Sequence, residues 1–170
     1  MSSYEIRAIK FIHQVYSYIN NCSTVGEYEA SIRVYNAQHH RHVHCDAGSA
    51  RIALITSDYV IKLNYNPYKV KEWGGCEQEL KLYNQAFKDG FDYLLAKIKP
   101  YYYKGQVFYI MPRIHNIAKT FYDADYYMTA QEYNWCKSVE LHDLHRYNYG
   151  WKNRHIVIID YGANKYKQST

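Results

Sequence analysis

Residues 141–162 read LHDLHRYNYGWKNRHIVIIDYG, and this stretch decides the fold that we expect for the chain. The apolar run at residues 156–159 contains β-branched side chains and is bounded by turn residues, which is typical of a buried strand. Asp160 follows the run, whereas Asp143 and Asn148 precede it among turn-forming residues. One carboxylate is therefore expected in a loop and the other at the carboxyl end of a strand.

The residue types in this stretch suit phosphoryl transfer. That reaction uses one Asp to accept or orient the hydroxyl proton, and an Asn and a second Asp to hold Mg²⁺ against the phosphates. Asp143 and Asn148 have the spacing of the protein-kinase catalytic loop, and residues 160–162 (DYG) stand where that family carries its metal-binding Asp-Phe-Gly. The stretch therefore resembles the protein-kinase-like superfamily. Its Asp-Leu-His sequence is closer to the bacterial and phage branches, and to the aminoglycoside phosphotransferases, than to eukaryotic kinases.

The resemblance covers residues 45–162 and implies an α+β, two-lobed, protein-kinase-like fold. We expect an N-terminal helical extension at residues 1–38 and an N-lobe at residues 39–113, with an antiparallel sheet and one αC-like helix. A much reduced helical C-lobe is expected at residues 114–170. Little sequence follows Gly162, so we expect neither an activation segment nor substrate-docking helices. Very short kinase-like proteins of this kind are found among phage proteins and bacterial effectors.

The same resemblance implies roles for five polar side chains, with ATP and Mg²⁺ as cofactors. Asp143 would orient the acceptor hydroxyl, and Asn148 and Asp160 would hold Mg²⁺. Lys62 would hold the ATP phosphates, because residues 60–62 (VIK) match the end of the family's Val-Ala-Ile-Lys strand. A glutamate on the following helix would pair with Lys62. Without the resemblance, a lone strand lysine is more often a residue that protects a sheet edge.

Helical periodicity selects that glutamate from two on the helix that we expect at residues 76–88 (CEQELKLYNQAFK). Glu79 shares its face with the apolar neighbours Cys76, Leu82, Tyr83 and Ala86. Glu77 shares its face with Lys81 and Asn84, which is a solvent face. A carboxylate on an apolar stripe needs a partner. Glu79 is therefore the candidate, and the alternative is that it only flanks the stripe.

A small-residue turn at residues 46–51 (DAGSAR) precedes a hairpin that we expect from strands at residues 51–56 and 59–63. In the resembled family this turn folds over the ATP phosphates. Gly48 and Ser49 are therefore candidate nucleotide-binding residues. The family carries three glycines in this turn, and this chain carries one.

Two further strands are expected at residues 91–103 and 106–111, after which Pro112 and Arg113 interrupt the pattern. The resemblance places main-chain groups of Pro112 and Arg113 at the adenine, with Met111 guarding the pocket behind it. Proline has no N–H, so only its carbonyl could serve.

Capping-box patterns begin at Ser2, Thr24 and Thr129, each followed three residues later by a glutamate. They predict helices at residues 3–20, at residues 24–36 and from residue 129 onward. The middle prediction competes with a strand, because its β-branched residues suit either structure. A short helix and loop are expected at residues 116–128.

Residues 38–45 (QHHRHVHC) are expected to form a strand that places His40, His42 and His44 on one face. Such a face could bind a metal, or it could be a polar face beside the phosphate turn. No set of Asp, Glu or Cys partners stands at ligand spacing, so we assign no metal to it.

Composition limits the class of protein. Hydrophobic residues make up 48% and charged residues 22% of the chain, which indicates a folded core. No apolar run reaches membrane-span length and no signal-peptide core is present. We therefore expect a cytoplasmic protein, in the host cytoplasm if a phage or effector gene encodes it. The four cysteines are widely spaced, which favours free thiols.

Net charge and tyrosine content bear on partners. A net charge of +5 favours anionic ligands, nucleotides included, but is too small to indicate a nucleic-acid binder. The 22 tyrosines could be half-buried rings at sheet edges, a surface for a protein partner, or targets of autophosphorylation.

Two functions fit the sequence. The first is an ATP- and Mg²⁺-dependent phosphotransferase that acts on a host protein or on itself, and the presence of all five polar groups favours it. The second is a catalytically weak or dead pseudokinase-like module that inhibits or redirects a host protein. The missing substrate-docking region, the single glycine of the phosphate turn, and Leu141 in place of the family's loop histidine favour this second function.

Overall fold

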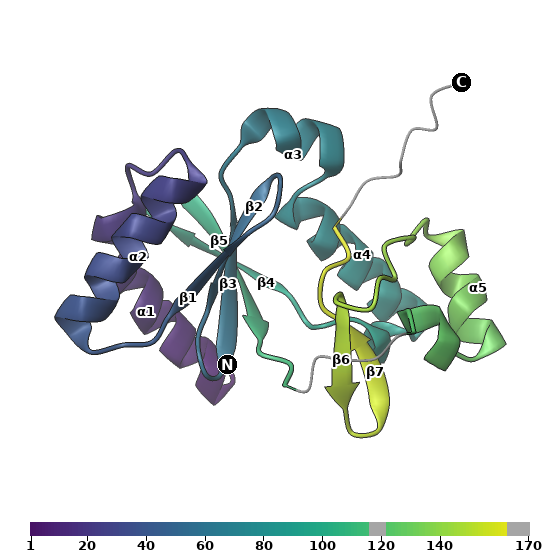
Figure 1. Ribbon diagram of the computed structural model, residues 1–170. Coiled ribbons are helices and arrows are strands. Elements are labelled where there is room, and N and C mark those ends of the chain that lie inside the picture. Colours follow the sequence, from purple (N-terminus) through teal and green to yellow (C-terminus); the bar gives the residue numbers. More distant parts are fainter. Residues whose placement is uncertain (116–121, 163–170) are drawn as a thin grey trace. The chain divides into compact units, whose positions relative to one another are not determined.

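The computed structural model describes residues 1–115 and 122–162, which form an α+β chain with a five-stranded antiparallel sheet (Figure 1). The chain divides into two compact units. Of the described residues, the first comprises residues 1–71 and 98–113, and the second comprises residues 72–97, 114–115 and 122–162. Over the described residues, no helix is long and apolar enough to cross a membrane.

The sheet of the first unit has the strand order β1-β2-β3-β5-β4, and every neighbouring pair is antiparallel. The strands are β1 (His44–Ala47), β2 (Arg51–Ile55), β3 (Tyr59–Asn64), β4 (Lys99–Tyr103) and β5 (Gln106–Pro112). The predicted hairpin is confirmed as β2 and β3. Thr56 closes its turn, because the Thr56 N–H donates to the Tyr59 carbonyl at 3.0 Å.

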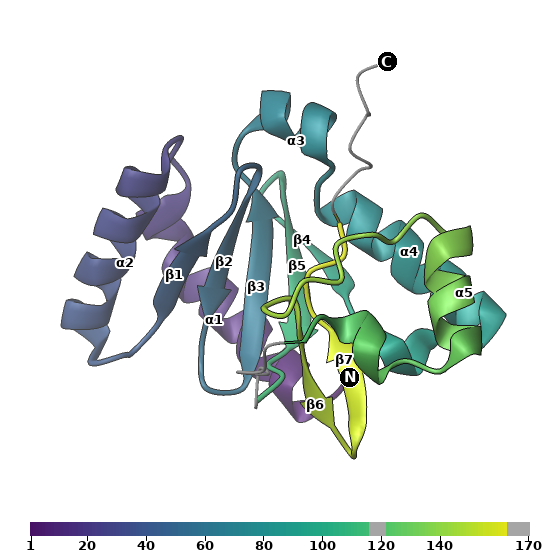
Figure 2. The same cartoon turned by 45° about the vertical axis from the view of Figure 1, so that its right-hand side comes forward.

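Helices α1 (Ser3–Ile19) and α2 (Val25–His39) pack together against one face of this sheet (Figures 1 and 2). Both predicted helices are confirmed, and a capping box begins each of them. In α1 the Ser2 N–H donates to the Glu5 carboxylate at 2.8 Å. The capping pattern therefore located the start of both helices correctly.

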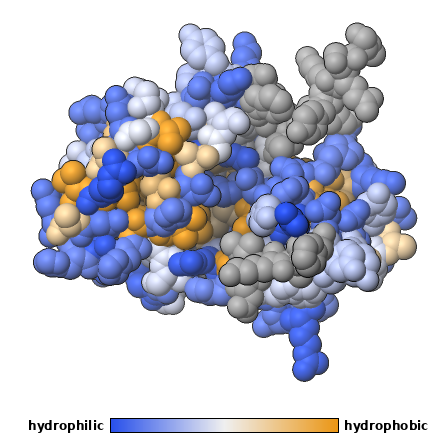
Figure 3. All heavy atoms as spheres, in the orientation of Figure 1, coloured by the Kyte–Doolittle hydropathy of each residue, from blue (hydrophilic) through white to orange (hydrophobic). Residues whose placement is uncertain are grey.

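The hydrophobic core of the first unit lies between these helices and the sheet. It includes Ala8, Phe11, Ile12, Val15, Ile19, Tyr28, Ile32 and Tyr35 from the helices, and Ile52, Leu54, Ile61, Leu63, Phe108 and Ile110 from the strands. The surface seen in Figure 3 is largely hydrophilic, with apolar side chains gathered over the part formed by the helices and the first strands. Helices and sheet thus belong to one packed body.

The strand predicted at residues 38–45 is wrong. Helix α2 continues through His39, His40 ends it in a left-handed conformation with φ of 50°, and only the last two residues of the predicted strand, His44 and Cys45, lie in β1. The Asn36 side chain explains the difference: its Nδ2 donates to the Val43 carbonyl at 2.8 Å, and its Oδ1 accepts from the Val43 N–H at 3.0 Å. A side-chain amide therefore takes both hydrogen bonds that a neighbouring strand would make. The three histidines do not share a strand face.

Two other segments differ from their predictions. Between the strand predicted at residues 59–63 and the helix predicted at residues 76–88, the structure adds α3 (Pro67–Trp73), and Asn66 caps it by accepting from the Lys69 N–H at 3.1 Å. An asparagine followed by proline is a helix-start signal. The strand predicted at residues 91–103 is confined to β4. Before it come the 3₁₀ helix η1 (Asp92–Leu94) and residues of the second unit.

The second unit contains α4 (Cys76–Asp89), η1, the 3₁₀ helix η2 (Ala124–Tyr127), α5 (Ala130–Ser138) and a hairpin of β6 (Tyr149–Lys152) and β7 (His155–Ile158). The predicted helices at residues 76–88 and after Thr129 are confirmed, as is the strand in the apolar run. Strand β6 was not predicted. Of the helix and loop expected at residues 116–128, residues 116–121 lie outside the described part of the chain.

Candidate functional site

The loop that carries Asp143 is fixed by main-chain hydrogen bonds to the elements on either side of it. The Leu141 N–H donates to the Cys136 carbonyl of α5 at 2.9 Å, after Glu140 has turned the chain with φ of 61°. The Leu144 carbonyl accepts from the Ala124 N–H of η2 at 2.8 Å. Asp143 is thus held between two anchored residues, and its half-buried side chain is positioned by the backbone rather than by a regular element.

Asn148 joins this loop to the end of strand β7. Its side-chain Nδ2 donates to the Asp143 carbonyl at 3.4 Å, and its own carbonyl accepts from the Ile159 N–H at 2.7 Å. Asp160 follows Ile159 directly. The three residues of the predicted catalytic and metal-binding set are therefore brought to one place within the second unit.

Glu79 of α4 reaches the residue that follows Asp160. The Tyr161 N–H donates to Glu79 Oε1 at 3.3 Å, and the Tyr161 hydroxyl donates to the Ala96 carbonyl. Burial, and then the neighbouring Glu79 carboxylate, raise the pKa of Tyr161 well above its usual value. The side chain of Tyr161 is therefore a neutral hydrogen-bond donor that fixes the backbone beside Asp160.

The burial of the two α4 glutamates agrees with their periodicity. Glu79 is fully buried and Glu77 is exposed. A carboxylate in an apolar environment is retained at a cost in desolvation, which requires compensating hydrogen bonds. The Tyr161 N–H supplies one of them. Glu79 is thus tied to the residue after Asp160.

A pocket of about 290 Å³ opens beside Asp143 in the second unit. Its lining includes Lys137 of α5, Leu141, His142 and His145. The histidines are exposed, whereas Leu141, at the position where the resembled family carries a histidine, is only 3% exposed. A carboxylate at the wall of an open pocket can accept a proton from a bound hydroxyl.

Lys62 lies in the first unit, in the middle of β3. It pairs with Ala53 of β2 and Tyr109 of β5. Its neighbours Ile61 and Leu63 belong to the core under the helices, so Lys62 points to the opposite face of the sheet. The side chain is 8% exposed.

The turn with Gly48 and Ser49 joins β1 to β2, as predicted. The Gly48 N–H donates to the Arg51 carbonyl at 3.0 Å, and the Tyr65 hydroxyl donates to the carbonyls of Gly48 and Ser49 at 3.3 and 3.2 Å. Gly48 does not have a positive φ, and a Cβ there would meet only the Arg51 carbonyl, at 3.9 Å. The backbone of this turn therefore does not require a glycine.

The residues predicted to meet adenine lie at the end of β5. The Arg113 N–H donates to the Asp58 carbonyl at 3.0 Å, and the Arg113 guanidinium donates to the Thr56 carbonyl at 2.6 Å. Since Pro112 has no N–H, a ligand would find carbonyl acceptors here rather than a donor. Met111 is buried and pairs with Val60, on the same face of the sheet as Lys62. The Gly48 turn lies at the other end of the sheet from Arg113.

Two features of the second unit were not predicted from the sequence. These are the hydrogen bonds from Tyr161 to Glu79 and to Ala96, which join residues 82 and 65 positions apart, and no local sequence pattern predicts them.

Asn148 and Asp160 offer the oxygen ligands that Mg²⁺ prefers, and Mg²⁺ commonly takes few protein ligands beside phosphate and water. Among the described residues, no group of three or more His, Cys, Asp or Glu side chains could hold a metal by itself.

No protein-family model, curated protein or solved structure matches this chain.

Proposed function

We propose that the protein is an ATP- and Mg²⁺-dependent phosphotransferase with a minimal, two-lobed kinase-like fold, acting on a host protein or on itself. One observation carries the proposal: Asp143, Asn148 and the residue before Asp160 are joined by consecutive hydrogen bonds in one unit. A constellation built from separate loop and strand residues needs such anchoring to hold its geometry.

Each polar group has a role in this proposal. Asp143 accepts or orients the proton of the acceptor hydroxyl at the wall of the open pocket. Asn148 and Asp160 supply oxygen ligands for Mg²⁺, which neutralises phosphate charge when it is bound. Lys62 binds the ATP phosphates, and Glu79, on the helix that corresponds to the family's αC, fixes Lys62.

The remaining candidates concern the nucleotide itself. Gly48 and Ser49 form the turn over the phosphates, and the lack of a side chain at Gly48 favours close approach of a phosphate to the backbone. Met111 and the main chain of Pro112 and Arg113 contact the base. Because the Arg113 N–H is already used by Asp58, base recognition through this segment relies on carbonyl acceptors.

Thermal unfolding with and without Mg·ATP tests nucleotide binding. A ligand present at one hundred times its Kd adds about 2.7 kcal/mol to the free energy of unfolding. We expect wild type and the control Glu29→Gln, an exposed acid on α2, to shift alike. Asp160→Asn should lose the Mg²⁺-dependent part of the shift. Absence of any shift in wild type would contradict the nucleotide site.

Transfer of labelled γ-phosphate tests the chemistry separately. Asp143→Asn removes the proton acceptor but keeps the size of the side chain, so we expect transfer to fall by at least a hundredfold while the Mg·ATP thermal shift persists. Glu29→Gln again serves as the control. Equal transfer by wild type and Asp143→Asn would rule out the role of Asp143.

The second candidate function is a binding module that occupies a host protein without transferring phosphate. The engagement of the Arg113 N–H by Asp58 favours it, because a nucleotide loses a main-chain donor there. This function predicts that the protein captures the same host partner from lysate whether or not Asp143 is replaced by Asn. Capture that depends on Asp143 and on Mg·ATP would favour the enzyme.

A further inference from the structure

A cavity of about 430 Å³ lies in the first unit, where α1, the end of α2 and the β2–β3 turn meet. Its apolar part is formed by Phe11, Tyr35 and Tyr59, all of them buried. Phe11 and Tyr35 meet edge to face with ring centroids 5.5 Å apart, and Phe11 and Tyr59 are tilted at 5.9 Å. Aromatic rings held in this way give a rigid wall for a flat ligand.

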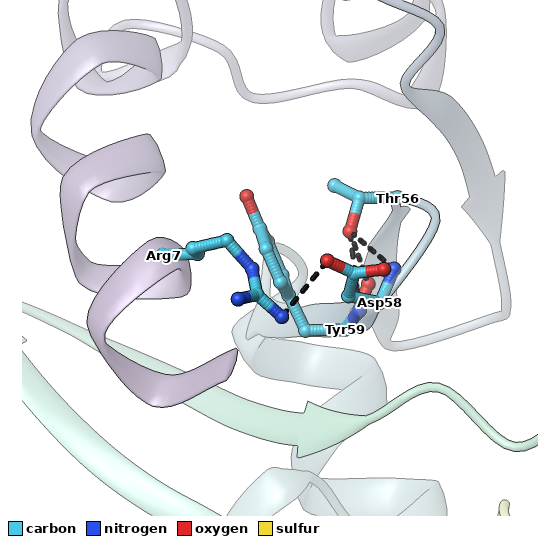
Figure 4. Close-up of polar contacts among 4 residues, drawn as sticks. All are labelled: Arg7, Thr56, Asp58 and Tyr59. Carbon is cyan, nitrogen blue, oxygen red and sulfur yellow. Dashed lines mark hydrogen bonds and ion pairs between the residues drawn. The ribbon is translucent and has the colours of Figure 1, made fainter. Parts of the chain in front are cut away.

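The rim of the cavity is cationic. Arg7 and Lys10 of α1 and Arg41, just beyond α2, line it, and all three are exposed. Asp58 is the one acid among the described residues that line the cavity, and it pairs with Arg7 at 2.9 Å. Figure 4 shows Arg7 extending from α1 toward Asp58 at the β2–β3 turn. Three cations thus face one carboxylate, which leaves a positive potential at the opening.

Arg41 lies near the aromatic wall as well as the rim. Burial raises the pKa of Tyr59 to about 12, and the charge of Arg41 acts in the opposite direction on Tyr59 and also on Tyr35. A guanidinium beside two rings can bind an anion with two parallel hydrogen bonds while the rings contact the rest of the ligand.

We propose that this cavity binds a small aromatic phosphomonoester, with the phosphate at Arg41 and Lys10 and the aromatic body against Phe11, Tyr35 and Tyr59. The cavity has the size of a small-molecule site, and it combines an apolar wall with a few convergent charges. The inference does not rest on the proposed phosphotransferase, because neither Lys62 nor the Gly48 turn lines this cavity.

Calorimetric titration with phenyl phosphate tests the site on the full chain. We expect saturable binding to wild type, at least tenfold weaker binding to Arg41→Ala, and unchanged binding to Lys81→Ala, which removes the same charge from an exposed position on α4. Arg41 is exposed, so its loss should leave folding intact. Arg41→Lys provides a second variant, which keeps the charge but loses the paired donors and should bind with intermediate affinity.

Asp58→Asn gives a change of opposite sign. It releases Arg7 and removes the one lining carboxylate, so phenyl phosphate should bind severalfold more tightly. Inorganic phosphate should bind more weakly than phenyl phosphate, because it lacks the ring. The affinities of AMP and of free phosphotyrosine would then be compared. The tighter of the two would show whether the natural ligand is a nucleotide or a phosphorylated tyrosine.

Three results would overturn the proposal. They are no saturable binding of phenyl phosphate to wild type, equal weakening by Arg41→Ala and Lys81→Ala, or equal affinity for phosphate and phenyl phosphate. Lys62→Met separates this site from the proposed ATP site. It should abolish the Mg·ATP thermal shift but leave phenyl phosphate binding unchanged, so either proposal can fail alone.

Discussion

The two units of the chain hold their polar groups in different ways. In the first unit, Arg7, Lys10 and Arg41 stand at the rim of a cavity whose wall belongs to a continuous hydrophobic core. In the second unit, Asp143 and Asn148 are placed by hydrogen bonds between loops and strand ends. Single rim residues can therefore change without loss of the fold in the first unit, whereas polar groups of the second unit depend on one another.

The first unit should be broken most severely through its core. Ile12 on α1 is fully buried among strands and helices, whereas Ile6 on the same helix is 43% exposed. Ile12→Ala leaves a cavity and should lower the free energy of unfolding by about 2–5 kcal/mol. Ile6→Ala, the matched control, should change it by less than about 0.5 kcal/mol.

Urea denaturation of both variants, with circular dichroism as the signal, provides the measurement. Equal losses for Ile12→Ala and Ile6→Ala would mean that α1 is not part of the core of the first unit.

The same contrast explains what the sequence could predict of the fold. Helices α1, α2, α4 and α5 and strands β2, β3 and β7 follow from caps, periodicity and apolar runs, which act within a few residues. The prediction of a strand at residues 38–45 was wrong because the Asn36 side chain makes hydrogen bonds with the main chain of Val43. Leu94, Leu95, Ala96 and Ile98 are buried, yet only Ile98 belongs to the first unit. Apolar character alone does not show which element such a residue packs against.

Strand β6 is also accompanied by a local sequence signal. Residues 149–152 follow a stretch of turn-forming residues, yet they pair with β7. Asn153 and Arg154 connect the two strands and have φ values of 50° and 68°. Two successive left-handed residues make the tight turn that suits a hairpin. An asparagine two to three residues before an apolar strand is the local cue.

Local sequence patterns predicted only part of the candidate site. Periodicity separated buried Glu79 from exposed Glu77. It could not show that the Tyr161 N–H would donate to Glu79, because 82 positions separate the two residues and only the folded unit brings them together.

The interdependence of the second unit can be tested at Tyr161. Its buried hydroxyl donates to the Ala96 carbonyl, and Tyr161→Phe leaves that carbonyl without this donor. We expect a loss of about 1–3 kcal/mol in the free energy of unfolding. Tyr147→Phe, at a 57% exposed ring on the loop that carries Asp143, should have almost no effect.

The pH dependence of the same variant carries a second expectation. Because burial raises the pKa of Tyr161 in the folded state, its contribution to stability is complete below about pH 10, the ordinary tyrosine value, and falls as pH rises above it. Tyr161→Phe should remove that alkaline component, measured as unfolding free energy between neutral and alkaline pH. If the unfolding free energy of Tyr161→Phe fell at alkaline pH as that of wild type does, the raised pKa of Tyr161 would not be the cause of the alkaline loss of stability.

The same Thr-x-x-Glu capping box occurs once in each unit and gives a finer comparison. Glu27 of α2 is exposed and accepts from the Thr24 N–H at 3.0 Å. Glu132 of α5 is 9% exposed, accepts from the Thr129 N–H at 2.6 Å, and also accepts from the Tyr93 hydroxyl at 3.0 Å. Glu132→Ala should cost about 1–2 kcal/mol, and Glu27→Ala should cost less.

Acid unfolding tests the role of the carboxylate in these boxes. Hydrogen bonds from Ser23 and Thr24 lower the pKa of Glu27, and for Glu132 burial opposes ionisation but hydrogen bonds from Thr129 and Tyr93 outweigh it. Each carboxylate therefore stabilises the fold above its ordinary pKa of 4.5, and the contribution disappears as pH falls. Thermal unfolding at pH 7 and pH 3 should show a smaller difference for Glu132→Ala than for wild type.

The smallest expected effect concerns how each unit ends a helix. Helix α4 ends at Gly90 with φ of 80°, whereas α2 ends at His40 with φ of 50°, on the rim of the aromatic cavity. A left-handed conformation costs an L-residue about 1–2 kcal/mol. Glycine avoids this cost, but it loses more conformational entropy on folding, which offsets about 0.5–1 kcal/mol of the gain. His40→Gly should therefore raise the free energy of unfolding by about 0.5–1 kcal/mol. Gly90→Ala, whose Cβ would meet nothing within 4 Å, should lower the free energy of unfolding by a similar amount through backbone strain alone.

His40→Gly also links helix termination to the proposed ligand. If His40→Gly stabilises the fold and also weakens phenyl phosphate binding, the chain has kept a strained residue for its ligand. If it does neither, His40 is not strained and the cavity does not use it.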